Sequence, residues 1–468
     1  MKNKIEKIVK ENPNKIAYKV NDKFITYKEL WDSSCYYAEL LKKQGTSPVI
    51  IYGHKDIDVI ISILSCILAD RTYVPVELST PINRLKQIIK ISNSSLIISN
   101  NKLIIDNIDC ISLDELNKFK DNEINENKND IVYIIFTSGS TGIPKGVPIS
   151  KENLNNFVNW ISDLKPLCDY RDINVFNQAS FSFDLSVADI FYSLCNGHTL
   201  IALNNDINEN FDEVFKTFTE IDVAVMTPTF MKICLLNKQF NSNNYPKLKC
   251  VYFCGEQLDV KIVRNLYNAF PKLVVINAYG PTEATSAVSA ITITKEMADN
   301  MELLPVGEID NFATKIDIID GEIVLSGKSV FSGYLDNYVG GYYKNDNINC
   351  YKTGDIGYIE DGKLYCKGRM DSQIKYKGYR IELSDIENNI NLINGIKGCA
   401  VVAKCDDNLV VKTIKAFVEV EKNVDINYIK TELKKHIPIY MIPKTIKIIE
   451  RLPINKNGKI DRKALSEL

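Results

Sequence analysis

The 468-residue sequence has little of what a metal centre or a histidine-based catalytic triad would need. It has three histidines, and they lie far apart in the sequence at His54, His198 and His436. Its twelve cysteines include no Cys-x-x-Cys pair and follow no regular spacing. A zinc site, a Ser-His-Asp triad and a disulfide framework are therefore all disfavoured, and we expect the cysteines to be reduced thiols in protein cores.

An excess of positive charge and a long apolar run are also lacking. Lys and Arg total 57 against 59 Asp and Glu, so no basic field is available to hold nucleic acid or an anionic membrane. The most apolar stretch, residues 59–68, is too short to span a bilayer and predicts a buried helix. The N-terminus lacks the unbroken apolar core of a secretory signal. We therefore expect a cytoplasmic protein that inserts into no membrane.

The order of helical and strand-like patterns predicts an α/β fold. Thr26 and Glu29 are spaced as a capping box at the start of a helix, and a strand is expected at 103–105. Strand-like runs then alternate with helical patterns, which is typical of a layered α/β domain with largely parallel sheets. These runs lie at 131–137, 222–226, 249–253 and 274–277. Past about residue 305, short strands with glycine turns predict a small β subdomain, and the last hundred residues predict a separate small α+β domain.

The strongest local signal is a polar loop that directly follows the apolar strand ending at Thr137. Glycines let backbone N–H groups approach an anion closely, while hydroxyl groups and a lysine add donors and charge. Phosphate is the ligand that such a loop favours. Pro144 precedes the lysine where a Walker A loop needs glycine, so the loop is not of that type. The candidate phosphate-binding residues are Thr137, Ser138, Gly139, Ser140, Thr141, Gly142 and Lys145.

This loop resembles the phosphate loop of the adenylate-forming ligases, which include acyl-CoA synthetases, luciferases and the adenylation domains of nonribosomal peptide synthetases. Four later segments resemble motifs of the same family in the same order, and they are 277–285, 351–357, 368–382 and 452–463. The resemblance covers essentially the whole chain. It implies an N-terminal AMP-binding domain at 1–370 and a small mobile C-terminal domain at 371–468. It also implies ATP-dependent activation of a carboxylic acid with release of pyrophosphate.

The resemblance also assigns the nucleotide and metal sites. Tyr279 would offer its face to the adenine, and Asp355 would accept hydrogen bonds from the ribose hydroxyls with the assistance of Arg369. Thr282 would touch the α-phosphate, and Glu283 would bind the Mg²⁺ that accompanies ATP. The further nucleotide-binding residues implied are Gly255, Glu256, Asn277, Ala278 and Gly280.

Two residues near the C-terminus have roles implied only by the resemblance. Lys459, in an Asn-Gly-Lys turn, would enter the site as the catalytic lysine and clamp carboxylate and α-phosphate oxygens. Its work would be positioning and charge stabilisation, without a covalent enzyme nucleophile. Asp371 would be the hinge about which the C-terminal domain swings between an adenylating and a thiol-transferring pose.

Asp184 indicates that the activated acid is an amino acid. It lies in an otherwise apolar or small-residue run, and a buried carboxylate needs a cation or donors beside it. The alternative is an acid at a helix N-cap or in a first turn. In amino-acid-activating members an aspartate here pairs with the substrate α-ammonium. The substrate pocket implied by the family comprises Asp184, Leu185, Ala188, Val225, Cys254, Ala278, Ser286, Ala287 and Lys459.

Within the amino-acid branch, residues 181–187 and 253–256 resemble the D-alanine–D-alanyl carrier protein ligases, in which the cysteine matching Cys254 favours D-alanine over L-alanine. Ala188 stands where that family carries a bulky methionine, and Ser286 replaces an apolar residue. A larger or hydroxylated amino acid would therefore also fit. A peptide-synthetase-type adenylating enzyme for another amino acid, a coenzyme A ligase of a small acid and a non-catalytic nucleotide-binding protein stay open as alternatives.

The thiol acceptor is expected to be a separate phosphopantetheinylated carrier protein, because the sequence ends soon after the lysine motif without a carrier domain. The basic, glycine-containing loop at 373–380 would line the channel for the pantetheine arm. A monomer is expected. Whether the product serves cell-wall teichoic acid or a secondary metabolite is open at this point.

Overall fold

The computed structural model describes residues 1–105, 108–118, 130–139, 142–204, 211–335, 340–371, 373–376, 378–405, 411–421, 424–454 and 460–467. The chain divides into two compact units. The first unit comprises residues 1–78, 91–135 and 147–367, and the second comprises 79–90, 136–146 and 368–468. Along the chain the second unit thus resumes at Gly368, and it also includes the predicted phosphate loop. The expected domain boundary at 370/371 stays a prediction.

An eight-stranded sheet organises the first unit. Its inner strands, β13, β12, β11, β9, β10 and β1, pair in parallel. The edge strands β2 and β14 each pair antiparallel with their neighbour. Val225 lies opposite both Asn177 and Tyr252, so the carboxyl ends of three neighbouring strands meet at one edge of the sheet. In spatial order the strands are β14 (Ser289–Ile293), β13 (Val274–Tyr279), β12 (Cys250–Phe253), β11 (Val223–Met226), β9 (Asn174–Asn177), β10 (Thr199–Ala202), β1 (Ile16–Val20) and β2 (Lys23–Thr26).

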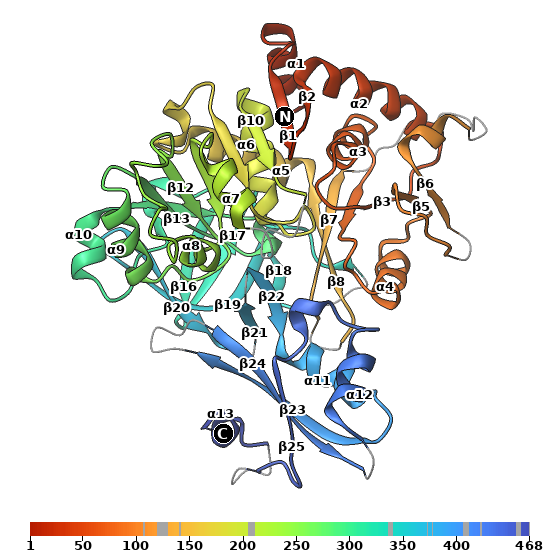
Figure 1. The fold of residues 1–468 in the computed structure, drawn as a ribbon, viewed down its shortest axis with the longest axis vertical. Helices are drawn as coiled ribbons and strands as arrows, with labels where there is room; N and C mark the ends of the chain where they lie inside the picture. The colour runs from red at the N-terminus through yellow and green to blue at the C-terminus, as the bar shows by residue number, and fades with distance from the viewer. Residues whose placement is uncertain are drawn as a thin grey trace. The chain divides into compact units, whose positions relative to one another are not determined.

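Each face of this sheet packs into a separate apolar core. Val251 and Phe253 of β12 face a core with α9, whereas Tyr252 and Cys254 face the core that contains α6. Figure 1 shows α8, α9 and α10 beside β12 and β13. The helices of this unit are α1 (Lys2–Glu11), α2 (Tyr27–Lys42), α3 (Ile57–Leu68), α5 (Lys151–Asp163), α6 (Leu185–Asn196), α7 (Phe211–Phe218), α8 (Pro228–Cys234), α9 (Val260–Ala269) and α10 (Lys295–Asn300).

A second, six-stranded sheet carries the N-terminal part of the first unit. The predicted helix over 59–68 is confirmed as α3, and Thr26 and Glu29 form the predicted capping box of α2. The strand expected at 103–105 is wrong, because Ile104 is 96% exposed and residues 109–111 pair with β5 instead. In spatial order the strands are β6 (Asp109–Ile111), β5 (Leu96–Ile98), β3 (Val49–Tyr52), β4 (Tyr73–Val76), β7 (Ile131–Thr137) and β8 (Lys145–Ser150).

Glycine turns build the predicted β subdomain. Asp320 and Gly321 both have positive φ at the turn between β16 and β17, and Asp361 and Gly362 do the same between β19 and β20. Two consecutive residues of positive φ match the twist of tight hairpins. The strands are β15 (Gly307–Glu308), β16 (Lys315–Ile319), β17 (Glu322–Ser326), β18 (Tyr342–Asn345), β19 (Ile348–Glu360) and β20 (Lys363–Arg369).

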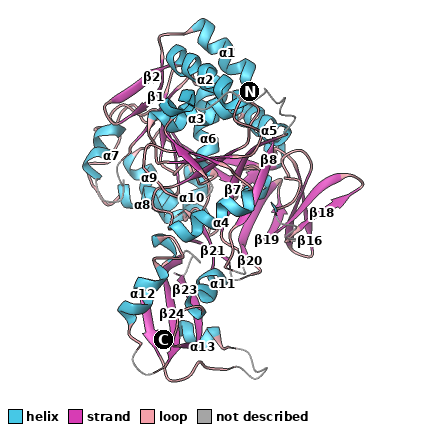
Figure 2. Cartoon of the chain, turned by 90° about the vertical axis from the view of Figure 1, so that its right-hand side faces the viewer, coloured by secondary structure: helices cyan, strands magenta, loops and turns pink. Residues whose placement is uncertain are grey.

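The second unit has its own α+β core, as the sequence predicts for the last hundred residues. Helices α11 and α12 pack on one face of a three-stranded sheet, and Leu465 of α13 packs on the other. Figure 2 labels α4, α11, α12, α13, β21, β23 and β24, and Figure 1 also labels β22 and β25. The elements of this unit are β21 (Gln373–Tyr376), β22 (Tyr379–Glu382), β23 (Ile396–Cys405), β24 (Val411–Val420), β25 (Thr445–Ile448), α11 (Leu383–Asn391), α12 (Ile426–Leu433), α13 (Arg462–Glu467) and most of α4 (Ile82–Ser92).

Two expectations from composition can be compared with the fold. All twelve cysteines lie in the described part of the chain, and each is a thiol rather than half of a disulfide. Their expected place in protein cores holds for seven of them, whereas four are half-buried and Cys405 is exposed. Within that same part, none of the helices combines the length and the apolar character that crossing a bilayer requires.

Candidate active site

The carboxyl ends of β9, β11, β12 and β13 collect most of the site residues that the sequence assigns to the first unit. Asp184 follows β9, Cys254 and Gly255 follow β12, and Tyr279 ends β13. Open α/β sheets bind their ligands at the carboxyl ends of parallel strands, so this edge is the natural site. The apolar members of the expected pocket share one buried core, and they are Leu185, Ala188, Val225, Cys254, Ala278 and Ala287.

Asp184 occupies the N-cap position of α6 and is 7% exposed. The alternative interpretation of Asp184, an acid at a helix N-cap, is confirmed for its position. The Asp184 carboxylate, however, makes no capping hydrogen bond to the helix backbone. Tyr252 lies nearby: burial, followed by the charges of Cys254 and Asp184, raises the pKa of Tyr252. The Tyr252 hydroxyl is therefore protonated and can donate a hydrogen bond in the neighbourhood of the Asp184 carboxylate.

Three buried hydroxyl groups in this region have no hydrogen-bond partner among the described residues, those of Tyr133, Tyr252 and Ser286, and the charge of Asp184 acts on Tyr133 as it does on Tyr252. The carbonyl of Ser286 accepts a weak hydrogen bond from Cys254 Sγ at 3.9 Å. Because buried polar groups are nearly always paired, these hydroxyls could satisfy a polar ligand. Sequence analysis missed Tyr252, although strand alternation places it on the same face as Cys254, two residues further on.

The turn that carries Ser286 is unusually tight. Thr285 and Ser286 adopt φ values of 64° and 71°, in the left-handed region. A Cβ on Gly280 would lie 2.5 Å from the Cα of Ala287, so only glycine allows the two segments to approach this closely. The glycine of the predicted nucleotide motif thus has a packing role of its own.

The residues predicted to hold adenine and ribose contact each other. The Tyr279 hydroxyl donates to Asp355 Oδ2 at 2.6 Å, and both side chains are buried. The backbone N–H of Asp355 donates to Thr353 Oγ1 at 3.0 Å. Burial, followed by the Asp355 charge, raises the pKa of Tyr279 well above its usual value, so its hydroxyl stays a donor. The two predicted residues therefore act as one hydrogen-bonded pair.

Thr282 and Glu283 begin a short 3₁₀ turn after β13 (Thr282–Ala284), and both are buried. The Tyr334 hydroxyl donates to Glu283 Oε1 at 2.5 Å, and the N–H of Phe331 donates to the Glu283 carbonyl at 2.9 Å. Sequence analysis missed Tyr334, which comes from a distant segment. The described residues hold no cluster of three or more metal ligands. A lone carboxylate with an adjacent hydroxyl fits Mg²⁺, which usually keeps few protein ligands and takes the rest from phosphates and water.

Two further residues predicted to bind the nucleotide, Asn277 and Glu256, form hydrogen bonds with backbone groups. Asn277 Nδ2 donates to the carbonyl of Pro305 at 2.8 Å, and Glu256 Oε2 accepts from the N–H of Thr229 at 2.9 Å. Gly255 has φ +90°, and a Cβ there would lie 3.2 Å from the Phe183 ring. The Glu256 bond ties the loop after β12 to the start of α8, and the Asn277 bond ties the segment at Pro305 to β13.

In the second unit, the predicted phosphate loop packs against the start of α11. Ser138 Oγ donates to the carbonyl of Arg380 and accepts from the N–H of Glu382, both at 2.9 Å. Lys145 Nζ lies 3.7 Å from Glu382 Oε1. Thr137 is buried at the end of β7. Both Ser138 and Lys145 therefore contact Glu382, which sequence analysis did not assign to the site.

Asp385 makes a second carboxylate contact with this loop. It is fully buried, accepts from the N–H of Gly139, and lies 3.3 Å from Arg84 Nη1. Burial raises the pKa of Asp385, although Arg84, the Gly139 N–H and Lys145 oppose the shift. A Cβ on Gly142 would lie 3.2 Å from Asn388 Cβ on α11. The groups expected to bind phosphate thus meet carboxylates in this structure.

Arg369 and Asp371 form a two-point ion pair. Arg369 Nε donates to Asp371 Oδ1 and Nη2 to Oδ2, each at 2.7 Å. Burial acts to raise the pKa of Asp371, but the hydrogen bond and charge of the Arg369 guanidinium hold that pKa below its usual value. The segment expected to be a basic loop at 373–380 lies largely in the paired strands β21 and β22, and the Tyr379 ring of β22 stacks on Tyr440 with centroids 3.6 Å apart. Ser140, Thr141 and Lys459 lie outside the described residues.

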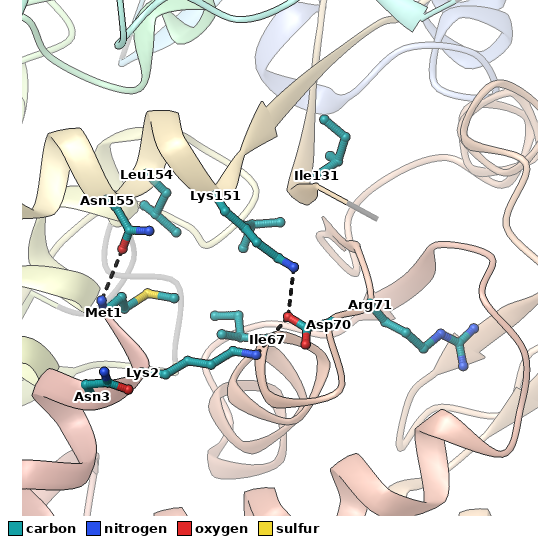
Figure 3. Close-up of a pocket in the computed structure, with 11 residues that line it drawn as sticks. Met1, Lys2, Asn3, Ile67, Asp70, Arg71, Ile131, Lys151, Leu154 and Asn155 are labelled. Carbon is teal, nitrogen blue, oxygen red and sulfur yellow. Dashed lines mark hydrogen bonds and ion pairs between the residues drawn. The ribbon is translucent and has the colours of Figure 1, made fainter. Parts of the chain in front are cut away.

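A cavity of about 280 Å³ elsewhere in the first unit has no predicted site residue in its lining. Lys2 and Lys151 both point to Asp70, at 2.8 Å and 3.0 Å (Figure 3). The Met1 amino group donates to Asn155 Oδ1 at 3.0 Å. The lysines of the lining thus share Asp70, Arg71 donates to backbone carbonyls, and the cavity adds nothing to the predicted site.

Comparison with known proteins gives matches over the whole chain. Residues 5–335 match the AMP-binding enzyme model, and residues 385–459 match the AMP-binding enzyme C-terminal domain. The D-alanine–D-alanyl carrier protein ligase of Listeria monocytogenes serovar 1/2a is 38% identical, over 99% of this chain and 98% of its own length. The ligase of the same name from Bacillus licheniformis is 36% identical over the same shares.

Solved structures agree with these relatives on the fold. The Vibrio cholerae adenylation domain AlmE, in complex with glycyl-adenosine-5′-phosphate, superposes with a TM-score of 0.87 at 24% identity, covering 100% of this chain and 97% of that one. The o-succinylbenzoate CoA synthetase of Bacillus subtilis gives a TM-score of 0.83 at 19% identity, covering 100% and 98%. The predicted α/β fold, with its small C-terminal domain, is thereby confirmed.

Proposed function

Because the chain belongs to the AMP-binding enzymes and is an AMP-forming ligase, we propose that it activates D-alanine with ATP and loads it onto a carrier protein. The first step forms D-alanyl-adenylate and releases pyrophosphate. The second transfers the D-alanyl group to the phosphopantetheine thiol of a separate carrier protein and releases AMP. The observation that carries the proposal is the buried Asp184 carboxylate at the carboxyl edge of the sheet, where its charge and that of Cys254 both act on the buried Tyr252 hydroxyl. The 36–38% identity to D-alanine–D-alanyl carrier protein ligases supports it.

The chemistry needs orientation and charge compensation more than a nucleophile. A carboxylate oxygen of the amino acid attacks the α-phosphorus, and the bond to pyrophosphate breaks. The thiolate then attacks the acyl carbon, and the bond to AMP breaks. In this scheme Asp184 binds the substrate ammonium, the Tyr279–Asp355 pair binds adenosine, and Lys459 stabilises charge on the reacting oxygens.

Glu283 and Thr282 are the residues that would hold Mg²⁺ together with the ATP phosphates. The ion would neutralise charge on the phosphate oxygens when bound. Tyr334 fixes the Glu283 carboxylate through the bond at 2.5 Å, so the acid is held in one orientation beforehand. The hinge role of Asp371 and the pantetheine-channel role of 373–380 belong to the same proposal.

An amino acid with a hydroxyl side chain is a second candidate substrate. The Ser286 hydroxyl is buried and has no partner in the described part of the chain, so a polar substrate group could satisfy it. Ala188 adds space, because it is smaller than the methionine expected from the resemblance. The partner is in both cases a carrier protein. We propose that the enzyme acts as a monomer and that the reaction takes place in the cytoplasm, where ATP is supplied.

The experiment is amino-acid-dependent exchange of labelled pyrophosphate into ATP, measured with both enantiomers of the common amino acids and β-alanine. The proposal predicts a dominant D-alanine signal that Lys459→Ala abolishes. A dominant D-serine or L-serine signal would move the substrate to the second candidate while keeping the mechanism. Silence across the panel, from folded protein with Mg²⁺ present, would overturn the amino-acid assignment.

A further inference from the structure

Lys55, between β3 and α3, is a buried cation that the proposed chemistry does not use. It is 1% exposed, and its Nζ donates to the carbonyls of Gln178 at 2.9 Å and Asn177 at 3.3 Å. Burying an ammonium is costly unless it is paired and hydrogen-bonded. The bonds that offset this cost hold the backbone just where β9 ends and the chain sets out towards Asp184.

The acid whose charge does most to raise the pKa of Lys55 lies on α6, the helix that begins after Asp184. Asp189 is fully buried, and its Oδ2 accepts from Asn177 Nδ2 at 2.8 Å. Burial lowers the pKa of Lys55 to about 8, while Asp189 and then Glu77 act to raise it. Burial likewise raises the pKa of Asp189, and the Asn177 amide and Lys55 oppose that shift. Lys55 and Asp189 thus act on each other electrostatically, and the Asn177–Asp189 hydrogen bond ties the end of β9 to α6.

A further bond extends this link to the next strand. Gln178 Oε1 accepts from the N–H of Thr227 at 3.2 Å, and Thr227 caps α8 directly after β11. The Lys55 ammonium therefore acts on the carboxyl ends of two strands that carry the candidate pocket. The segment between Gln178 and Asp184 is held at its start by the Lys55 bonds, and the Asn177–Asp189 hydrogen bond ties that same strand end to α6, the helix that follows the segment.

We propose that Lys55 is a positioning residue of the amino-acid site, which fixes the 178–184 segment so that the Asp184 carboxylate stands where the substrate ammonium binds. This inference rests on the proposed function in one respect, namely that Asp184 anchors the amino acid. The contact of Lys55 with two backbone carbonyls is independent of that function.

The test compares Lys55→Met with Arg71→Met. Arg71 is an equally buried cation of the same unit, and it also donates to backbone carbonyls, those of Leu41 and Ser47. Both variants lose bonds of the same kind, so general destabilisation affects both. In pyrophosphate exchange we expect Lys55→Met to raise the KM for the amino acid about tenfold and to change the KM for ATP less than about twofold. Arg71→Met should leave both KM values within about twofold of the parent.

Amide hydrogen exchange on the full chain gives a second readout that needs no substrate. We expect faster exchange at 178–187 in Lys55→Met, and unchanged exchange there in Arg71→Met. Unchanged exchange at 178–187 in Lys55→Met overturns the proposal, even if the parent protein activates no amino acid. An active parent whose amino-acid KM is the same in Lys55→Met overturns it as well. Absence of exchange activity in the parent instead counts against the proposed function.

Discussion

Replacing Asp184 by asparagine separates recognition of the substrate ammonium from every other part of the reaction. The change keeps the size and shape of the side chain but removes its charge. Asp184 is 7% exposed, so solvent screens its interaction with a bound ammonium only weakly. Truncating one partner of a buried, hydrogen-bonded charge pair costs about 2–5 kcal/mol. At about 1.36 kcal/mol per tenfold in rate, we therefore expect kcat/KM for D-alanine to fall by about 30- to 5,000-fold.

Propionate provides the matched control, because it has the carbon skeleton of alanine without the amino group. In Asp184→Asn, kcat/KM for propionate should stay within about threefold of the parent value or rise, since no charge is lost against this substrate. Thermal unfolding first shows that the variant is folded. The rate of pyrophosphate release, which accompanies formation of the adenylate, is then measured with each of the two substrates. An equal loss for D-alanine and propionate, or no loss for either, would refute the assignment of Asp184.

Three further changes test other parts of the account. Tyr279→Phe removes the hydroxyl that donates to Asp355. Titration calorimetry should then show weaker ATP binding, and urea unfolding should show a free energy of unfolding lower by about 1.5–3 kcal/mol. An unaltered ATP affinity would contradict the paired role of the two residues. Glu382→Gln weakens the competitor for Lys145, so ATP should bind up to about fivefold more tightly, whereas weaker binding would contradict competition. Burial, with Lys15 and Arg171, lowers the pKa of His198 from 6.5 to about 4, so the unfolded chain binds a proton that the folded chain excludes. Lowering the pH from 7 to 5 should therefore reduce the free energy of unfolding of the parent by about 2 kcal/mol more than that of His198→Gln. The same pH dependence of unfolding free energy in both proteins would contradict this prediction.

Local features of the fold could be predicted from the sequence because short-range chemistry determines them. The capping box of Thr26 and Glu29 and the turns at Gly321 and Gly362 depend on neighbouring residues alone. The parallel strands are marked by apolar runs that are buried on both faces. The strand prediction at 103–105 is wrong because an apolar run does not distinguish a buried strand from an exposed segment, and Ile104 faces solvent.

The parts of the site that could not be predicted depend on contacts between distant segments. Nothing in the local sequence links Lys55 to Asp189, or Glu382 to the loop at Ser138. Tyr252 is an intermediate case, since alternation along β12 places it on the face of Cys254, but its approach to Asp184 requires the tertiary fold. Motif resemblance identifies residues that recur in a family, whereas these partners come from how this chain packs.

The most direct test of the central claim is the intact mass of a D-alanyl carrier protein after incubation with this enzyme, ATP, Mg²⁺ and D-alanine. The account predicts that the phosphopantetheinylated carrier gains one alanyl group, and that the unmodified carrier and the reaction without ATP show no gain. Replacing D-alanine by L-alanine should sharply reduce the loaded fraction. A carrier whose mass does not change, although the enzyme exchanges pyrophosphate with D-alanine, would contradict the transfer step. Preferential loading of a different amino acid would contradict the substrate.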